Sequence, residues 1–232
     1  MKQLKEIKNK IAFEKYYDPG FNWSNPVIYE QKFSKSFIKE FKNKIDWSFY
    51  FLYSKFTFSE LKYLYKNYPK VFTEDTFDSL CITRYWTFKE IEYFFDKLSL
   101  SLLFQFNNKN MSTNTLIKLI EKVGVDNIKK SYWLDISFSQ LPETFIKKFK
   151  DYIDWTIFLE NNKCSEKFLI KYEKYLDWTA VSQWQDLSES FIEKYQKKVN
   201  WLEIFQCQEL SEEFCKRWKF KYDEFIENSY IN

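Results

Sequence analysis

Apolar residues recur along this chain with two superimposed spacings. Within short segments they lie three and four residues apart, as Phe191 and Tyr195 do, which places them on one face of a helix. Over longer distances the whole pattern returns every 23 residues, so that Trp155, Trp178 and Trp201 hold one equivalent position. A fixed period of this length is typical of stacked helical repeats.

Each 23-residue unit divides into two helical halves. The first half begins near a serine followed by an acid, as at Ser188, because a serine oxygen accepts the free N–H groups of a helix start. The second half begins at Asp154, Asp177 or Asn200, each a short acceptor that caps a helix, followed by tryptophan. Helices this short are stable only when packed against neighbours. The pattern therefore predicts an all-α solenoid of short helix-turn-helix repeats.

We expect one domain over residues 1–232, with nine units of which the last is truncated. Clean repeats cover 33–56 and 141–232, and degenerate repeats cover 1–32 and 57–140. In the first of the degenerate stretches, Asn22-Trp23 matches the Asp-Trp position, and Phe13 lies at the position that Phe145 holds later.

The period lengthens between residues 57 and 140. Insertions centre on 73–86 and 124–140, and Pro69 and Gly124 lie near expected helix ends. The insertions have two interpretations that the sequence leaves open: longer loops, or the place where the units carry a function.

The repeat motif resembles the short repeats of many bacteriophage and giant-virus proteins. The motif is formed by Asp177-Trp178, Gln183 to Gln185, Leu187-Ser188-Glu189 and Phe191 to Tyr195. The resemblance covers residues 141–222 and 33–54 well and the middle poorly. It implies a viral, all-helical interaction protein and supplies no catalytic residues.

Composition narrows the class of protein. The chain has two glycines, four prolines and 22% aromatic residues, which disfavours strand-and-turn architecture. The formal charge of +3 is too small to demand a polyanionic partner. No apolar run approaches 18 residues, so we expect no membrane span and a place in the cytoplasm of the host cell. The four cysteines occupy unrelated repeat positions and are expected to be reduced (Cys81, Cys164, Cys207 and Cys215).

Candidate catalytic chemistry is sparse. The chain has no histidine, no C-x-x-C spacing and no glycine-rich phosphate loop. Carboxylate chemistry at Asp46, Asp154 and Asp177 is conceivable, but Asn200 fills the same slot, and asparagine caps helices without exchanging protons. We therefore expect a protein that is not an enzyme, with no cofactor and no metal.

Two periodic features have competing interpretations. The in-register tryptophans suit a core between units, or stacking platforms for bases. The lysines of the first helices suit a solvated face paired with acids, or a basic stripe for nucleic acid. This lysine ladder comprises Lys147, Lys148, Lys150, Lys171, Lys174, Lys194, Lys197 and Lys198.

Partner-binding candidates are the out-of-register aromatic residues and the cations beside them, because Trp, Tyr and Arg most often dominate interface energy. They are Arg84, Tyr85, Trp86, Lys130, Tyr132, Trp133 and Trp184. With the lack of catalytic groups, the resemblance to viral repeats implies a protein-binding scaffold that occludes a host machine, such as a defence nuclease or a ribonucleoprotein. The alternative is a nucleic-acid-binding repeat protein that uses the lysine ladder and exposed aromatic residues.

Overall fold

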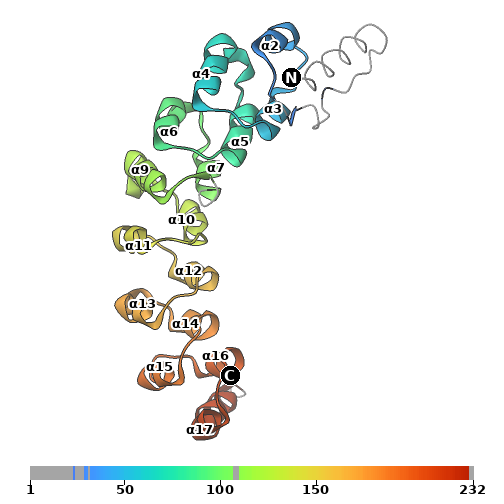
Figure 1. The fold of residues 1–232 in the computed structure, drawn as a ribbon. Helices are drawn as coiled ribbons and strands as arrows, with labels where there is room; N and C mark the ends of the chain where they lie inside the picture. Colours follow the sequence, from blue (N-terminus) through green and yellow to red (C-terminus); the bar gives the residue numbers. More distant parts are fainter. Residues whose placement is uncertain (1–22, 24–28, 31, 107–109, 230–232) are drawn as a thin grey trace. The chain divides into compact units, whose positions relative to one another are not determined.

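The computed structural model describes residues 23, 29–30, 32–106 and 110–229, and these form an all-α protein (Figure 1). The all-α class predicted from the sequence is confirmed. Within the described residues, extended pairing is limited to one isolated parallel bridge between Trp86 and Met111. Phe13 and Asn22, expected to belong to a first unit, lie outside the described residues. No described helix is long and apolar enough to cross a membrane.

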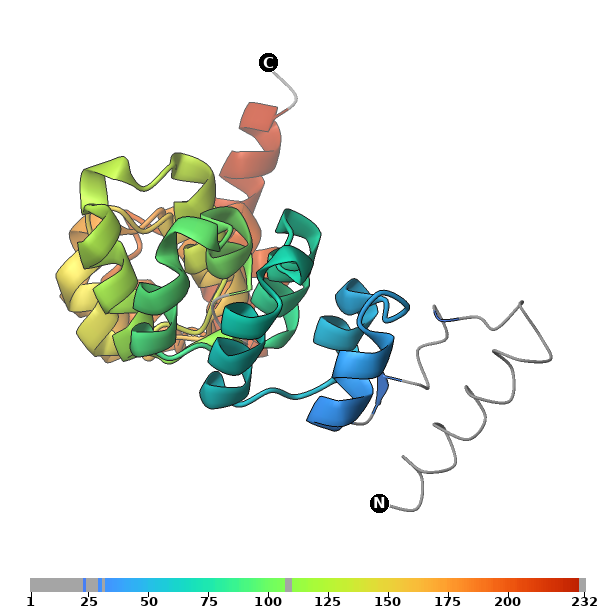
Figure 2. The ribbon, with the colours of Figure 1, turned by 90° about the horizontal axis from the view of Figure 1, so that it is seen from above.

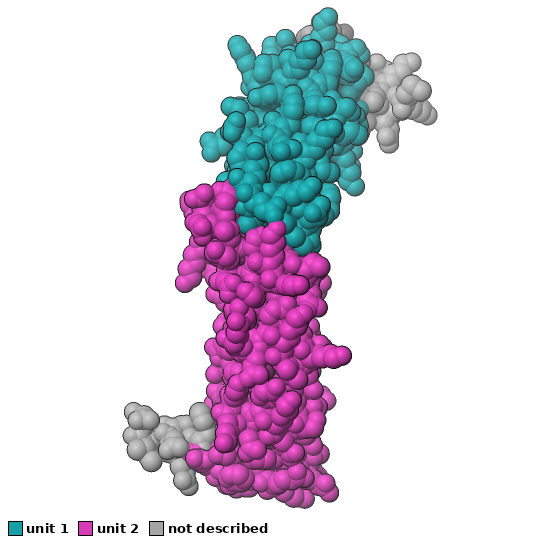
Figure 3. Space-filling view, turned by 90° about the vertical axis from the view of Figure 1, so that its left-hand side faces the viewer, with its two compact units in different colours: residues 1–122 teal, residues 123–232 magenta. Residues whose placement is uncertain are grey.

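The chain divides into two compact units, residues 1–122 and 123–232 (Figure 3). The boundary falls inside the stretch where the sequence period is degenerate.

Unit 1 consists of helices that alternate between two roles. A first helix of each pair is followed by a second helix, and consecutive second helices contact one another, α3 with α5 and α5 with α7. The first helices are α2 (Lys35–Phe41), α4 (Phe58–Asn67), α6 (Phe88–Phe94) and α9 (Thr113–Val123). The second helices are α3 (Trp47–Tyr53), α5 (Glu74–Thr83) and α7 (Leu100–Gln105).

Unit 2 continues the same alternation, with contacts between α10 and α12, α12 and α14, α14 and α16, and α16 and α17 (Figures 1 and 2). Its second helices are α10 (Lys130–Ser137), α12 (Trp155–Asn161), α14 (Trp178–Trp184) and α16 (Trp201–Cys207). Its first helices are α11 (Glu143–Phe149), α13 (Glu166–Lys171), α15 (Glu189–Lys194) and α17 (Glu212–Ser229), the last being 18 residues long.

The two sequence insertions are not longer loops. Residues 73–86 lie mainly in α5, which has 10 residues where α3 has 7. Residues 124–140 contain a 3₁₀ turn, Val125–Asn127, and then α10. Gly124 separates α9 from that turn with a φ of 87°, a left-handed conformation that glycine adopts without the clash a Cβ would bring. The loop interpretation of the insertions is therefore wrong, and the helix ends expected at Pro69 and Gly124 are confirmed.

The in-register tryptophans pack between helices to different extents. Trp47 and Trp155 are buried, which confirms a core role for them, whereas Trp178 and Trp201 are half-buried and pack against the edge of the core cluster of unit 2. Three of the four donate the indole N–H to the carbonyl five residues earlier, at 2.9 to 3.0 Å. Their ring planes lie against the next first helix, as Trp178 does against Tyr195 at 5.0 Å between centroids.

The second helices begin at the caps that the sequence predicts. The carboxylate of Asp154 accepts the N–H of Ile157 at 3.1 Å, and Asp177 accepts that of Thr179 at 2.8 Å. Asn200 accepts the N–H of Leu202 at 3.1 Å with its amide oxygen. Capping needs the acceptor atom and not the charge, so the assignment of these residues to helix caps is confirmed.

Replacing Asp177 tests this assignment. We expect Asp177→Asn to leave the free energy of unfolding nearly unchanged, because asparagine caps as well as aspartate, and Asp177→Ala to lower it by about 0.5–2 kcal/mol. Urea denaturation of both variants measures the difference. Equal and large losses in the two variants would show that the negative charge is needed.

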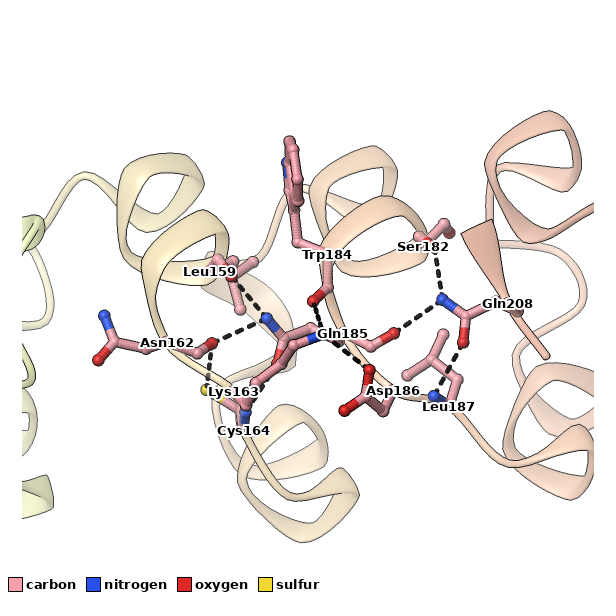
Figure 4. Close-up of polar contacts among 10 residues, drawn as sticks. All are labelled: Leu159, Asn162, Lys163, Cys164, Ser182, Trp184, Gln185, Asp186, Leu187 and Gln208. Atoms are coloured by element: carbon pink, nitrogen blue, oxygen red, sulfur yellow. Dashed lines mark hydrogen bonds and ion pairs between the residues drawn. The ribbon is translucent and has the colours of Figure 1, made fainter. Parts of the chain in front are cut away.

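A second periodic interaction joins consecutive second helices of unit 2 and is called here the amide clamp (Figure 4). The residue that follows each of these helices, Asn162, Gln185 or Gln208, reaches back to the preceding helix end. Gln185 Nε2 donates to the carbonyls of Leu159 and Asn162 at 2.7 and 2.9 Å, and Gln208 Nε2 donates to those of Ser182 and Gln185 at 2.8 and 2.7 Å. These carbonyls lie at helix ends, where the helix itself provides no donor.

The oxygen of each glutamine completes the clamp. Gln185 Oε1 accepts the N–H of Cys164 at 2.7 Å, and Gln208 Oε1 accepts that of Leu187 at 3.0 Å. The shorter Asn162 makes only the donor half, to the carbonyls of Ser139 and Phe158 at 3.2 and 3.0 Å. One buried side chain thus satisfies three backbone groups that would otherwise lack partners.

Removal of one clamp should destabilise the protein strongly. We expect Gln185→Ala to lower the free energy of unfolding by about 3 kcal/mol or more, because it leaves buried carbonyls and an N–H unsatisfied at about 1–3 kcal/mol each. The exposed Gln206, on α16, is the matched control, and Gln206→Ala should change stability little. Similar midpoints for both variants in urea would contradict a stabilising clamp.

Candidate partner-binding surface

Exposed aromatic side chains recur at one repeat position, at the C-terminal ends of second helices. Tyr53 and Trp184 each follow their unit's tryptophan by six residues, and Phe138 precedes Trp184 by two periods of 23. Their exposed fractions are 44%, 37% and 60%. Figure 4 shows the Trp184 side chain pointing away from the neighbouring Gln185 and its amide clamp. We call Tyr53, Tyr85, Phe138 and Trp184 the helix-end aromatic residues.

Tyr85 is added to this set in unit 1, although it lies two residues after Thr83, the last residue of α5. Its side chain is 57% exposed, and with Tyr53 it lines a pocket of about 490 Å³. Arg84, another sequence-predicted residue, lines the same pocket. The structure therefore brings Arg84 and Tyr85 together with Tyr53, a residue that the sequence analysis did not select.

Arg84 is held by a buried network and is not a free cation. Its guanidinium donates to the carbonyl of Phe56 and forms an ion pair with Glu90, and both side chains are nearly buried, at 12% and 7% exposed. The other oxygen of Glu90 accepts the N–H and hydroxyl of Thr87, at 2.9 and 2.8 Å, which caps α6. Arg84 also lies over the Trp86 ring, at 5.4 Å from its centroid. The ion pair compensates each of the two charges for the hydration that it loses on burial.

Trp86 and Trp133, also expected to bind a partner, lie in the core. Their exposed fractions are 0% and 5%, so they offer no surface to another protein in this structure. Trp86 packs edge-on against Phe94, and its backbone N–H donates to the carbonyl of Asn110. Trp133 stacks on Tyr152 at 5.3 Å. Both tryptophans are large apolar residues inside a helix pair, which is where the hydrophobic effect places them.

Lys130 and Tyr132 lie at the opposite end of α10 from Phe138. Lys130 is exposed at the first turn, and Tyr132 is half-buried with the ammonium of Lys129 at 5.7 Å from its ring centroid. These residues therefore do not belong to the helix-end position shared by Phe138 and Trp184.

The lysine ladder of unit 2 is interleaved with acids. Ion pairs join consecutive first helices and the turns that follow them, between Lys171 and Glu143, and between Lys198 and Glu173. Arg217 extends the series to Glu193 at 2.5 Å. Exposed pairs of this kind contribute little stability. They do lower the net positive charge that the face presents, as expected for a solvated mixed-charge surface.

The described residues hold no group of three or more His, Cys, Asp and Glu side chains placed to bind a metal ion. The four cysteines are free thiols. Burial raises the pKa of Cys81 to about 12 and that of Cys164 to about 11, so both thiols are protonated and weakly nucleophilic at neutral pH.

Comparison of the chain with protein families, with curated proteins and with solved structures finds no match.

Sequence reasoning missed Tyr53 and Phe138, although a usable signal was present. One repeat position is occupied by Tyr53, Asn161, Trp184 and Cys207, each six residues after a tryptophan, and by Phe138, six residues after Tyr132. Across the repeats this position holds polar as well as aromatic residues. That variation separates this exposed position from the core positions.

Alanine replacement separates the structural role of Arg84 from the surface role of Tyr85. We expect Arg84→Ala to lower the free energy of unfolding by about 3–5 kcal/mol, because it leaves the buried Glu90 carboxylate without its cation. Tyr85→Ala should leave stability within about 0.5 kcal/mol, as for other surface changes. Thermal and urea unfolding give both values, and an unchanged melting temperature for Arg84→Ala would show that the pair is not structural.

Proposed function

We propose that this chain is a protein-binding scaffold built as a solenoid of helix pairs. The alternation of first and second helices in each unit, with contacts between consecutive second helices, supports this architecture. The amide clamp supports it further, because it joins α12, α14 and α16 each to the second helix before it. Arrays of this kind offer an extended surface to a partner.

One observation carries the proposal: exposed aromatic residues share a repeat position at the second-helix ends. Other repeats have Asn161 and Cys207 there, so packing does not require an aromatic residue, yet the exposed position is aromatic three times, at Tyr53, Phe138 and Trp184. Tyr and Trp are enriched in the energetically dominant parts of protein interfaces. The proposal places the partner against these helix ends, in unit 1 at Tyr53 and Tyr85.

The nature of the target is proposed from the sequence motif. The likeness to bacteriophage and giant-virus repeats supports a viral source, a host-cell location and a host target such as a defence nuclease, with inhibition by occlusion. Binding is favoured over catalysis because the exposed features are aromatic and mixed-charge surfaces.

Nucleic-acid binding by the lysine ladder is less well supported. Lys171 and Lys198 already pair with carboxylates of neighbouring first helices, so binding a phosphate would first break those pairs. Nuclease treatment in the experiment below distinguishes this alternative.

Affinity capture tests the proposal. The immobilised protein is exposed to a lysate of the cells in which it is made, with and without nuclease, and retained proteins are quantified by mass spectrometry. We expect a partner that survives nuclease treatment, and we expect Tyr53→Ala with Tyr85→Ala, or Phe138→Ala with Trp184→Ala, to weaken its binding by about 2 kcal/mol or more.

Tyr93→Ala and Phe220→Ala are the matched controls. These side chains are similarly exposed, at 52% and 55%, but they lie on α6 and α17, outside the helix-end position. Loss of the partner on nuclease treatment would favour nucleic acid, and equal effects of control and helix-end variants would refute the proposed surface.

A further inference from the structure

The pocket of unit 1 lies where α3 and α5 end, at a junction that in unit 2 is filled by an amide clamp. Its volume is about 490 Å³, and it is bordered by the last residues of the two helices and the segments that follow them. The lining residues that bear on its chemistry are Ser54, Lys55, Phe56, Arg84 and the two tyrosines, Tyr53 and Tyr85.

Arg84 occupies the clamp position of this junction. It is the C-cap residue of its second helix, as Gln185 and Gln208 are of theirs. Like those glutamines it donates back to a carbonyl of the preceding segment, that of Phe56. A guanidinium has five donors and no acceptor, so Arg84 supplies the donor half of the clamp and lacks the acceptor half.

The missing acceptor leaves one backbone N–H unsatisfied. In unit 2 the clamp oxygen accepts from the residue two positions after the previous C-cap, Cys164 or Leu187. The equivalent residue after Ser54 is Phe56, and its N–H has no acceptor among the described residues, although its carbonyl is paired. The Nε of Arg84 is likewise buried without a partner.

Charge distinguishes this junction from the others. Lys55 and Arg84 are the charged residues that line the pocket, with no carboxylate among the lining side chains. Glu90 neutralises Arg84, whereas Lys55 is exposed and forms no hydrogen bond or ion pair with a described residue. Leu141, at the junction that Asn162 clamps, also has an N–H without an acceptor among the described residues, but the clamp side chain there is a neutral asparagine.

The ends of α3 and α5 oppose an anion only weakly. α3 has seven residues, and two of its last carbonyls already accept hydrogen bonds, Tyr50 from the N–H of Ser54 at 3.1 Å and Phe51 from the hydroxyl of Thr83 at 3.5 Å. The negative end of such a short, partly satisfied helix is a smaller charge than the ammonium of Lys55.

We infer that this pocket binds a carboxylate side chain, of Asp or Glu, that a protein partner inserts between α3 and α5. One carboxylate oxygen takes the place of the missing clamp oxygen at the Phe56 N–H, and the other pairs with Lys55. Tyr53 and Tyr85 flank the entrance, where their rings pack on the inserted chain. The inference deepens the proposed function, on which it rests, by naming the chemistry of the partner at unit 1.

Titration of the purified, ¹⁵N-labelled protein with small probes tests the inference without the partner. The probes are blocked amino acids, N-acetyl-glutamate methylamide, N-acetyl-glutamine methylamide and N-acetyl-lysine methylamide, followed by amide chemical shifts. We expect saturable shifts centred on Lys55 and Phe56 with the glutamate probe, and about tenfold weaker binding of the glutamine probe, since hydrogen bonds to charged groups contribute about 1.5–3 kcal/mol. The lysine probe should not bind.

Two variants sharpen the result. Lys55→Gln should weaken the glutamate probe by about tenfold, whereas Lys39→Gln, an exposed lysine of α2 outside the pocket, should not. Arg84→Gln combined with Glu90→Gln restores a glutamine to the clamp position, where its oxygen can accept the Phe56 N–H. The glutamine at position 90 can still form the capping box with Thr87. This double variant should no longer bind the glutamate probe while remaining folded. If the double variant does not fold, the binding measured for Lys55→Gln tests the carboxylate site by itself.

Three results would overturn the inference: no saturable shift at Lys55 and Phe56, equal binding of the glutamate and glutamine probes, or binding unchanged by Lys55→Gln. The test separates the two proposals. Probe binding without any captured protein partner would refute the proposed function and still support the carboxylate site. A captured partner without probe binding would overturn only the carboxylate site.

Discussion

The structure depends on how very short helices satisfy the carbonyls at their ends. A helix of seven residues leaves about as many backbone acceptors unpaired as it pairs, so a chain made of such helices needs outside donors at every turn. In unit 2 those donors are side chains of the next second helix: Gln185 serves the end of α12, and Gln208 serves the end of α14. In unit 1, Asn110 does the same for α5 by donating to the carbonyls of Cys81 and Ile82. The hydrophobic faces bring the helices together, and these polar contacts fix their spacing.

The periodic parts of this arrangement could be predicted from the sequence, because periodicity reports constraints shared by all repeats. Helix starts at Asp154, Asp177 and Asn200 follow from the chemistry of a short acceptor before tryptophan. The all-α class follows from spacing alone. The burial of Trp47 and Trp155 was also accessible, since a repeated large apolar residue suits a core.

The site was harder to predict because it depends on departures from the repeat. Trp86 and Trp133 look like surface aromatics in the sequence, since they are out of register, yet both are buried against aromatic residues of the core. Arg84 looks like an interface cation, but its partner Glu90 lies six residues later, a distance at which sequence gives no sign of contact. Only three-dimensional packing shows that Arg84 lies where α12, α14 and α16 are followed by an amide, and that the arginine leaves the Phe56 N–H without an acceptor among the described residues.

The amide clamp runs in one direction along unit 2, because the side chain of a later 23-residue repeat binds the backbone of the repeat before it. On the ribosome, each repeat of unit 2 therefore emerges with the carbonyls at the end of its second helix unpaired. They stay unpaired until the following repeat is made. Folding of unit 2 is thus coupled to the order of synthesis, each new pair of helices sealing the pair before it. A nascent chain paused between Leu159 and Gln185 would present the carbonyls of Leu159 and Asn162 without their donor, where a chaperone or a protease could bind. Loss of an earlier repeat would instead leave the amide of the following glutamine hydrated by water.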